Sequence, residues 1–171
     1  MASERIINFN GGVNEISALN AIIQLLDLNS ESKTEPIYLY INSPGGDIVF
    51  GLAIYDTLKY IEAPVYTICT GLAASMGSFL LSCGEKGHRS ALKHSRILIH
   101  QPLISTQSGY GEKESELRKL ANSLAKHRNT LEQIMAENTD NPVEKLHKDC
   151  ERDNWMTAEE ALKYGLIDSI I

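Results

Sequence analysis

The sequence predicts an α/β protein whose core is a parallel β-sheet covered by helices. Short apolar runs rich in β-branched residues alternate along the chain with longer segments that have helical periodicity. Strands that are separated by helices are joined by right-handed crossovers, which place the strands parallel in one sheet. The chain has 171 residues, of which 43% are hydrophobic, so a single domain spanning residues 1–171 can bury a full core.

The first half of the chain contains the strand and helix pairs that such a sheet requires. The expected strands are Arg5–Phe9, Ile37–Asn42, Val65–Thr70 and Arg96–His100. The expected helices run from about Val13 to Leu28, from about Ile48 to Tyr60, and from the break in the pattern at Gly71 to about Ser82. The first of these helices carries apolar residues on one face: Ile16, Leu19, Ile22, Ile23 and Leu26.

The second half begins with a long and highly charged helical pattern, which starts at Gly109–Glu112 and extends to about Asn138. Its apolar stripe consists of Leu117, Leu120, Leu124, Leu131 and Met135. A helix of this length exceeds what a small sheet needs for cover. Either it packs on the core of its own subunit, or it protrudes as an arm that buries its stripe against another subunit. The sequence leaves both arrangements open.

Three shorter elements are expected after this helix. Asn141–Pro142 caps a short helix, Thr157–Tyr164 forms another, and Leu166–Ile170 is expected to end the chain as a strand.

Charge and cysteine content exclude several classes of function. The net charge of -6 argues against a nucleic-acid or anionic-membrane surface, because both favour basic faces. The N-terminus has no apolar signal core, and no apolar run approaches the roughly 20 residues that span a bilayer. Cys69, Cys83 and Cys150 show no CxxC spacing, and the first two lie in apolar stretches as expected for core residues. We therefore expect a cytoplasmic protein without nucleic-acid or membrane partners.

The heptad Gly71–Gly77 is the first segment that could carry chemistry. It places Ser75 among small residues, where a strand ends and a helix begins. Helix N-termini leave backbone N–H groups unpaired, so a hydroxyl there can attack a carbonyl while neighbouring amides stabilise the oxyanion. A small-residue helix packed tightly on a sheet would have the same sequence, so the heptad alone does not decide between catalysis and packing.

A serine nucleophile needs a base, and His100 is the best placed of the five histidines. It closes the apolar strand that begins at Arg96, whereas the other four lie in polar stretches. Functional side chains gather at the carboxyl ends of parallel strands, where Ser75 is also expected. The turn Asn42–Gly46 follows another strand, so a Gly46 N–H fits a second oxyanion donor at the same edge. Each feature alone also suits an ordinary strand end or turn.

Together these segments resemble the proteolytic subunit of the Clp protease, the ClpP family. The resemblance rests on four motifs: Tyr38–Gly46, the heptad around Ser75, Ile99–Pro102, and the C-terminal run that includes Asp149–Trp155 and Ala158–Asp168. It extends over nearly the whole chain in order. The fold it implies is the crotonase-like spiral of βα units with a protruding helical handle, here at about residues 104–138.

The resemblance also implies roles for particular residues. Ser75 would be the nucleophile, His100 the general base, and Asp153 the acid that orients the imidazole. The backbone N–H groups of Gly46 and Met76 would form the oxyanion hole. Neither a cofactor nor a metal is implied. Without the resemblance, the residue types and spacing would not have favoured Asp153 over Asp149 or Asp140.

The implied activity is a serine endopeptidase that cuts peptides and unfolded proteins inside a barrel of stacked heptameric rings. The handle would mesh the two rings, and Arg152 would make a contact across their junction. Long proteins would enter only with an AAA+ unfoldase of the ClpX or ClpA type.

This sequence departs from the family pattern in three places. The segment that usually precedes the first strand is short. The hydrophobic docking site for the ATPase keeps Tyr40, Tyr60 and Ile68 but has Thr70 and Ser90 at usually apolar positions. The extra residues between His100 and Asp153 fall in Ile104–Tyr110.

Three alternatives to the peptidase fit parts of the pattern. A crotonase-type acyl-CoA enzyme shares the glycine-rich turns at strand ends but needs no serine–histidine pair. A noncatalytic or regulatory ring subunit would keep the ring contacts without cleaving peptides. A signal-peptide peptidase would require a lysine base and a membrane anchor.

Overall fold

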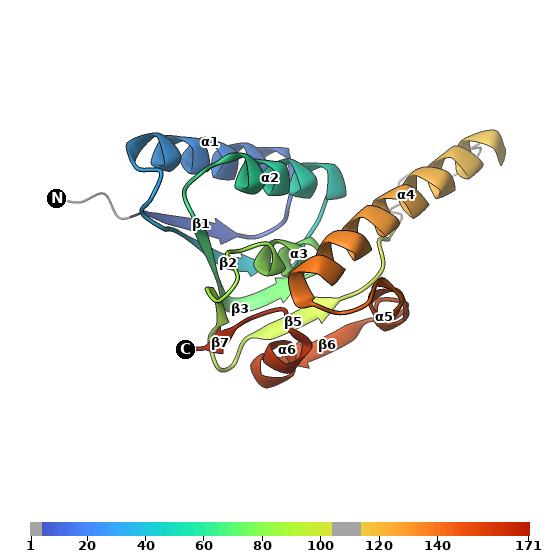
Figure 1. Cartoon of the computed structure of the whole chain (residues 1–171). Coiled ribbons are helices and arrows are strands. Elements are labelled where there is room, and N and C mark those ends of the chain that lie inside the picture. The colour runs from blue at the N-terminus through green and yellow to red at the C-terminus, as the bar shows by residue number, and fades with distance from the viewer. Residues whose placement is uncertain (1–4, 104–113) are drawn as a thin grey trace.

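The computed structural model describes residues 5–103 and 114–171 (Figure 1). Its helices are α1 (Glu15–Glu31), α2 (Ile48–Tyr60), α3 (Met76–Ser82), α4 (Glu114–Thr139), α5 (Val143–Asp149) and α6 (Ala158–Tyr164). Its strands are β1 (Ile6–Asn10), β2 (Ile37–Ser43), β3 (Val65–Ala74), β4 (Arg89–Ala91), β5 (Arg96–Ile99), β6 (Asn154–Thr157) and β7 (Ser169–Ile170). The mixed α/β class predicted from the alternation of strands and helices is confirmed.

The strands form one sheet with the order β1-β2-β3-β4-β7, and β5 and β6 branch from β3. All pairs along this path are parallel, as the sequence predicted. The pair between β5 and β6 is antiparallel, which the alternation of strands and helices did not predict. Three of the side chains with no exposed surface are Ile37 and Ile41 of β2 and Ile97 of β5, so the sheet supplies the centre of the core.

Strand β3 is longer than predicted because Gly71 does not end it. The first half of β3 pairs with β4 through Thr67–Cys69, and the second half pairs with β5 through Leu72–Ala74. Gly71 lies between the two halves with a φ of 140°, a backbone conformation that favours glycine. At this position a side chain, and not the backbone of a neighbouring strand, accepts the hydrogen bond: the Gly71 N–H donates to Ser95 Oγ at 3.2 Å. The sheet therefore divides at Gly71.

Helices α1 and α2 lie side by side over β1 and β2 (Figure 1). The buried face of α1 consists of Ala18, Ala21, Leu25 and Leu28. Most of the apolar face expected from the sequence points away from the core: Ile16, Leu19, Ile23 and Leu26 are exposed. The helix itself was predicted correctly. Its periodicity did not reveal that the predicted apolar face is exposed and that a different face packs on the subunit core.

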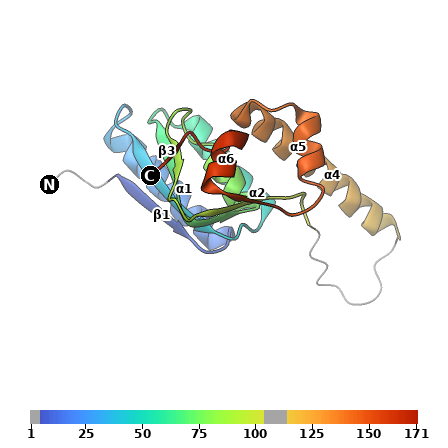
Figure 2. The ribbon, with the colours of Figure 1, turned by 90° about the horizontal axis from the view of Figure 1, so that it is seen from below.

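Helix α4 extends away from the sheet (Figure 2). Only its C-terminal part is buried, through Leu131, Met135 and Ala136. Leu117 and Leu120, in its N-terminal half, are exposed. This half therefore protrudes from the subunit, which favours the second of the two arrangements left open by the sequence. Residues 104–113, which include the start of the expected handle, lie outside the described residues.

The C-terminal elements close the second half of the sheet. Strand β6, missed in the sequence, runs beside β5 with Leu98 opposite Trp155. Thr157 then caps α6, because its hydroxyl accepts from the Glu160 N–H while the Glu160 carboxylate accepts from the Thr157 N–H. The last strand, β7, is shorter than expected and pairs with β4.

Cys69 and Cys83 are buried, as predicted, and Cys150 is buried as well. Burial raises the pKa of Cys83 to about 12, so its thiol stays neutral. Over residues 5–103 and 114–171, no helix is both long and apolar enough to cross a membrane.

An ion pair between Arg89 and Asp168 joins the start of β4 to the segment before β7. The Arg89 side chain is 4% exposed, and its Nη2 and Nε donate to the two Asp168 carboxylate oxygens at 2.6 and 2.9 Å. Asp168 also accepts from the Gly87 N–H. Burial alone would raise the pKa of Asp168, but the hydrogen bonds from Arg89 and Gly87 outweigh it and hold that pKa below its ordinary value.

We expect Asp168→Asn to lower the free energy of unfolding by about 3 kcal/mol, because it leaves the buried Arg89 guanidinium without its counter-charge. The matched control is Asp140→Asn, which breaks the exposed Lys86–Asp140 pair and should cost under about 1 kcal/mol. Urea unfolding measures both. The Asp168 contribution is present above its unfolded pKa and is lost as pH falls through the lower folded value. Asp168→Asn should therefore flatten the acid limb of the stability curve, and an unchanged limb would contradict this assignment.

Candidate active site

Ser75 occupies a strained turn between β3 and α3. It precedes the first helical residue rather than lying in the first turn, and its φ of 57° and ψ of -123° are unusual for a residue other than glycine. Its N–H donates to Leu98 O at 3.0 Å, which anchors the turn to β5. Its side chain makes no capping hydrogen bond to α3, so Ser75 does not serve as the cap of this helix. A strained turn whose serine hydroxyl makes no hydrogen bond to another described residue is typical of a nucleophile.

The turn that contains Gly45 and Gly46 approaches Ser75 closely. A Cβ atom added to Gly45 would lie 2.6 Å from both Ser75 Cβ and Ala74 O, so only glycine permits this contact. Gly46 forms a parallel bridge with Val13, and the Asp47 N–H donates to Val13 O at 2.9 Å. The glycine turn is therefore held between the segment before α1, through Val13, and the start of α3, through the close approach of Gly45 to Ser75.

Two backbone N–H groups are available beside Ser75. Met76 is the first residue of α3, so its N–H has no acceptor within that helix. Within residues 5–103 and 114–171, the Gly46 N–H donates to no backbone or side-chain acceptor. Two such amides that line the same cavity as a serine hydroxyl are the donors that an oxyanion hole needs.

His100 directly follows β5, which pairs with the C-terminal half of β3. Because Ala74 lies opposite Leu98 in this parallel pair, Ser75 and His100 leave the sheet at the same edge. The His100 Nδ1 atom is buried and has no hydrogen-bond partner among the described residues. Buried polar atoms are nearly always paired, so an unpaired one at a candidate site suggests a partner that is present in another state.

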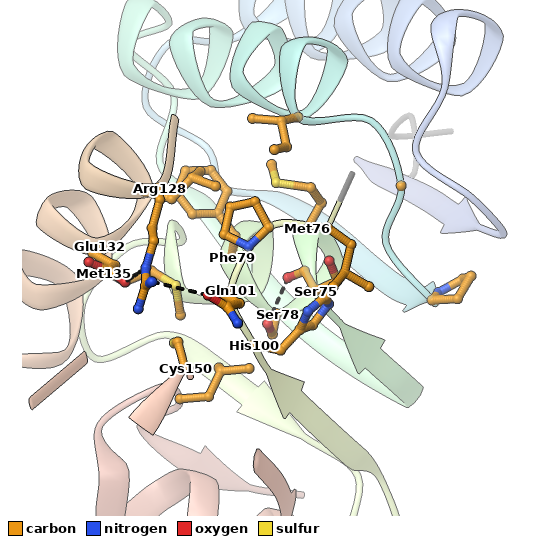
Figure 3. Close-up of a pocket in the computed structure, with 17 residues that line it drawn as sticks. Ser75, Met76, Ser78, Phe79, His100, Gln101, Arg128, Glu132, Met135 and Cys150 are labelled. Carbon is orange, nitrogen blue, oxygen red and sulfur yellow. Dashed lines mark hydrogen bonds and ion pairs between the residues drawn. The ribbon is translucent and has the colours of Figure 1, made fainter. Parts of the chain in front are cut away.

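Ser75, Met76, Gly46 and His100 all line one cavity of about 270 Å³ (Figure 3). Its remaining wall is mostly apolar, from Ile48, Phe79, Leu131 and Met135. Such a cavity can hold an apolar side chain of a substrate and keep water away from the reacting carbonyl.

Asp153 and Arg152 do not line this cavity. Both are exposed and lie in a shallow depression before β6, beside Trp155. Among the described residues, Asp153 makes no hydrogen bond to His100 and Arg152 makes no ion pair. The backbone nevertheless brings the two predicted triad members close, because Ile99 lies opposite Asn154 in the β5–β6 pair. His100 and Asp153 are the next residues outward on these two strands.

The other two acids considered from the sequence are held elsewhere. Asp149 accepts from Tyr164 Oη at 2.9 Å and pairs with Lys145. Burial would raise the pKa of Asp149, but the bonds from Lys145 and Tyr164 outweigh it and hold that pKa below its ordinary value. Asp140 pairs with Lys86 at the opposite end of α4 from the handle tip. Of the three acids, Asp153 is therefore the one whose carboxylate is left uncommitted in the described residues.

Sequence reasoning missed the polar residues of the cavity wall. Arg128 and Glu132 of α4 line the cavity together with Gln101 and Cys150. Burial and the nearby Glu132 carboxylate raise the pKa of Cys150 to about 12, so this thiol does not compete with Ser75 as a nucleophile. The spacing of Arg128 and Glu132 on a helix was a signal, but opposite charges four residues apart usually mark a solvated face.

Among the described residues, no cluster of three or more histidine, cysteine or acidic side chains could hold a metal ion.

Comparison with known proteins agrees with the motifs. Residues 1–171 match the family described as Clp protease. The chain is 49% identical over its whole length to the ATP-dependent Clp protease proteolytic subunit 2 of Prochlorococcus marinus (strain NATL2A), of which it covers 84%. It is 47% identical to the ATP-dependent Clp protease proteolytic subunit of Streptococcus pneumoniae (strain 70585) and 46% identical to that of Streptococcus salivarius, and it covers 86% of each. The family match covers the full length of the chain, and identities of 46–49% are higher than a shared fold alone would produce. This chain therefore belongs to the Clp protease family.

Proposed function

We propose that this chain is a serine endopeptidase subunit with Ser75 as nucleophile and His100 as general base. The observation that carries the proposal is the meeting of Ser75, on a strained turn, with His100 and two unpaired amides at one cavity. The family membership and the names of the relatives support the same activity.

The proposed reaction begins when His100 removes the proton of Ser75 Oγ as this oxygen attacks the carbonyl carbon of the substrate. The Gly46 and Met76 N–H groups stabilise the negative oxygen of the tetrahedral intermediate. The C–N bond then breaks, and His100 passes its proton to the leaving amine. Water, activated by His100, hydrolyses the ester on Ser75 and releases the new carboxyl end of the substrate.

Asp153 is proposed to accept a hydrogen bond from His100 Nδ1 and hold the imidazole in the tautomer that the reaction needs. The unpaired Nδ1 and the position of Asp153 one residue beyond the β5–β6 pair support this role. A rotation of the Asp153 side chain toward His100 is proposed to complete this contact.

Assembly into stacked rings is proposed from the exposed apolar side chains, and the heptameric number from the membership of the Clp protease family. On α1 these include Ile16 and Leu19, and on the protruding half of α4 they include Leu117 and Leu120. Contiguous apolar residues on the surface of a subunit mark interaction sites. Arg152, also exposed, is proposed to contact the facing ring.

The relatives are named as parts of ATP-dependent proteases, which supports an AAA+ unfoldase as the partner of this chain. Of the docking residues considered above, Tyr60 is strongly exposed, but Ile68 and Ser90 are buried in the subunit. A docking surface with fewer apolar groups is expected to bind such a partner more weakly.

Labelling with a fluorophosphonate tests the proposed nucleophile directly. Ser75 Oγ attacks the phosphorus atom, fluoride leaves, and the serine stays covalently phosphonylated, which peptide mapping by mass spectrometry locates. We expect one label per chain at Ser75, and heat-denatured protein should not react. Label on another residue, or no label on folded protein, would reject the mechanism.

A noncatalytic ring subunit remains the second candidate, because His100 and Asp153 are not hydrogen-bonded in the described structure. That candidate predicts rings of normal size, measured by light scattering, that neither react with the fluorophosphonate nor cleave peptides.

A further inference from the structure

The chain segment that follows His100 is held in place by its next residue, Gln101. The Gln101 N–H donates to Cys150 O at 2.6 Å, and its side-chain Nε2 donates to Glu151 O at 3.0 Å. These two bonds continue the contact between the β5 and β6 segments beyond the end of the strand pair. His100 therefore lies between the last residue pair of β5 and β6 on one side and the hydrogen bonds of Gln101 on the other.

The remaining polar atom of this side chain, Gln101 Oε1, accepts from Arg128 Nη1 at 3.0 Å (Figure 3). Arg128 also donates from Nη2 to His147 O at 3.0 Å and from Nε to Glu132 Oε1 at 2.7 Å. One guanidinium therefore joins α4, α5 and the segment after β5. A lysine could not reproduce this arrangement, because only the planar fork presents several donors in fixed directions.

Glu132 fixes the orientation of that fork. Its side chain is 6% exposed, and its second oxygen, Oε2, lies 3.0 Å from His147 Nδ1. Ion pairs that are buried to this extent add little stability, because desolvation offsets the attraction between the charges. A buried pair at the wall of the cavity is better explained by the geometry that it imposes on its neighbours.

We propose that Arg128 is a positioning residue for His100 and acts through Gln101. Arg128 holds Gln101, and Gln101 holds both the end of β5 and the segment from Cys150 that leads to Asp153. The proposal rests on the proposed function, since it assigns Arg128 to the same reaction. Losing the link lets the imidazole move away from Ser75 without removing any group that reacts.

The first test measures the rate at which a small fluorophosphonate labels Ser75, together with kcat and KM for a fluorogenic peptide. We expect Arg128→Gln to lower both the labelling rate and kcat by about tenfold to a hundredfold, since displacements near 1 Å cost this much. KM should change little. Arg128→Lys should recover only part of the loss. Arg118→Gln is the matched control and should label at the unchanged rate, because Arg118 of the same helix is exposed and pairs with Glu114, away from the cavity.

The second test asks whether Arg128 acts through Gln101. Gln101→Ala breaks the same link from its other end, so the double variant should be no slower than the slower single variant. Multiplied effects would overturn the proposal, because they show two independent roles. A raised KM with an unchanged labelling rate would also overturn it and make Arg128 a substrate-binding residue.

Two results would have a cause other than a positioning role of Arg128: failure of the proposed function itself, and loss of the fold. Wild-type protein that is not labelled at Ser75 refutes the proposed function itself. If Arg128→Gln lowers the thermal midpoint strongly, Gln101→Ala and Arg128→Lys decide the question, since each keeps part of the network. Unchanged labelling in both of these variants would then overturn the proposal.

Discussion

Ser75→Ala is expected to lower kcat for a short peptide by about a hundred-thousandfold or more, as the loss of a serine nucleophile does in other hydrolases. No acyl-enzyme can form in this variant, because neither the nearby hydroxyl nor the nearby thiol can replace Ser75. Ser78 Oγ is hydrogen-bonded to Ser75 O and Leu98 O, and the Cys150 thiol is neutral. Alanine keeps the size and the turn, so KM and ring assembly should stay near wild type. Peptide hydrolysis under saturating substrate measures the effect.

The control is Ser123→Ala. Ser123 is exposed on α4, beside the groove that runs next to the cavity, and it has no role in the proposed reaction. This variant should cleave peptide at the wild-type rate. A Ser75→Ala protein that retains more than about one hundredth of wild-type kcat would mean that the acyl-enzyme mechanism is wrong.

Asp153→Asn is expected to lower kcat by about ten-thousandfold, the loss seen when a triad acid becomes an amide that favours the wrong imidazole tautomer. This prediction depends on the unpaired His100 Nδ1 finding its acceptor in Asp153 in the active state. The effect should appear in peptide hydrolysis and also in fluorophosphonate labelling, because both require His100 to remove the proton from Ser75.

The matched variants are Asp149→Asn and Asp140→Asn, which change the two acids that are already paired with other groups. Asp149→Asn should lower stability modestly through the loss of its bonds to Tyr164 and Lys145, with a small effect on kcat. Asp140→Asn should leave kcat unchanged. If Asp149→Asn abolishes activity and Asp153→Asn does not, the orienting acid has been assigned incorrectly.

Local sequence patterns were sufficient for most elements but not for the way in which strands pair. Gly71 was interpreted as a break because glycine usually ends a strand, whereas here it lies inside β3 where the strand changes partners. Strand β6 was missed because a short segment after a helix carries little periodic signal, and its pairing with β5 depends on residues far away in the chain.

The outward face of α1 shows a different limit. Apolar residues lie on both sides of this helix, since Leu19 is exposed and Leu25 is buried. Hydrophobic periodicity identifies a face that avoids water but not whether its partner is the subunit core or another chain.

At the candidate site, the meeting of Ser75 and His100 at one cavity could be predicted because each directly follows a strand and the two strands are parallel. Their catalytic roles stay predictions. Gly46 could be predicted for the same reason. Arg128 and Glu132 could not, since a charged pair on a long polar helix normally faces solvent. Their approach to Gln101 results from how α4 packs, which depends on the tertiary structure and not on local sequence.

The division of β3 also determines the order in which the proposed centre can be completed during synthesis. The half of β3 that precedes Ser75 needs β5 as its neighbour, and the outer edge of β5 needs β6, which begins at Asn154. A growing chain that has not reached this residue already contains Ser75 and His100 but lacks the strand that borders His100. Proteins built during translation fold from the N-terminal side. The proposed catalytic centre can therefore be completed only after synthesis has passed Asn154.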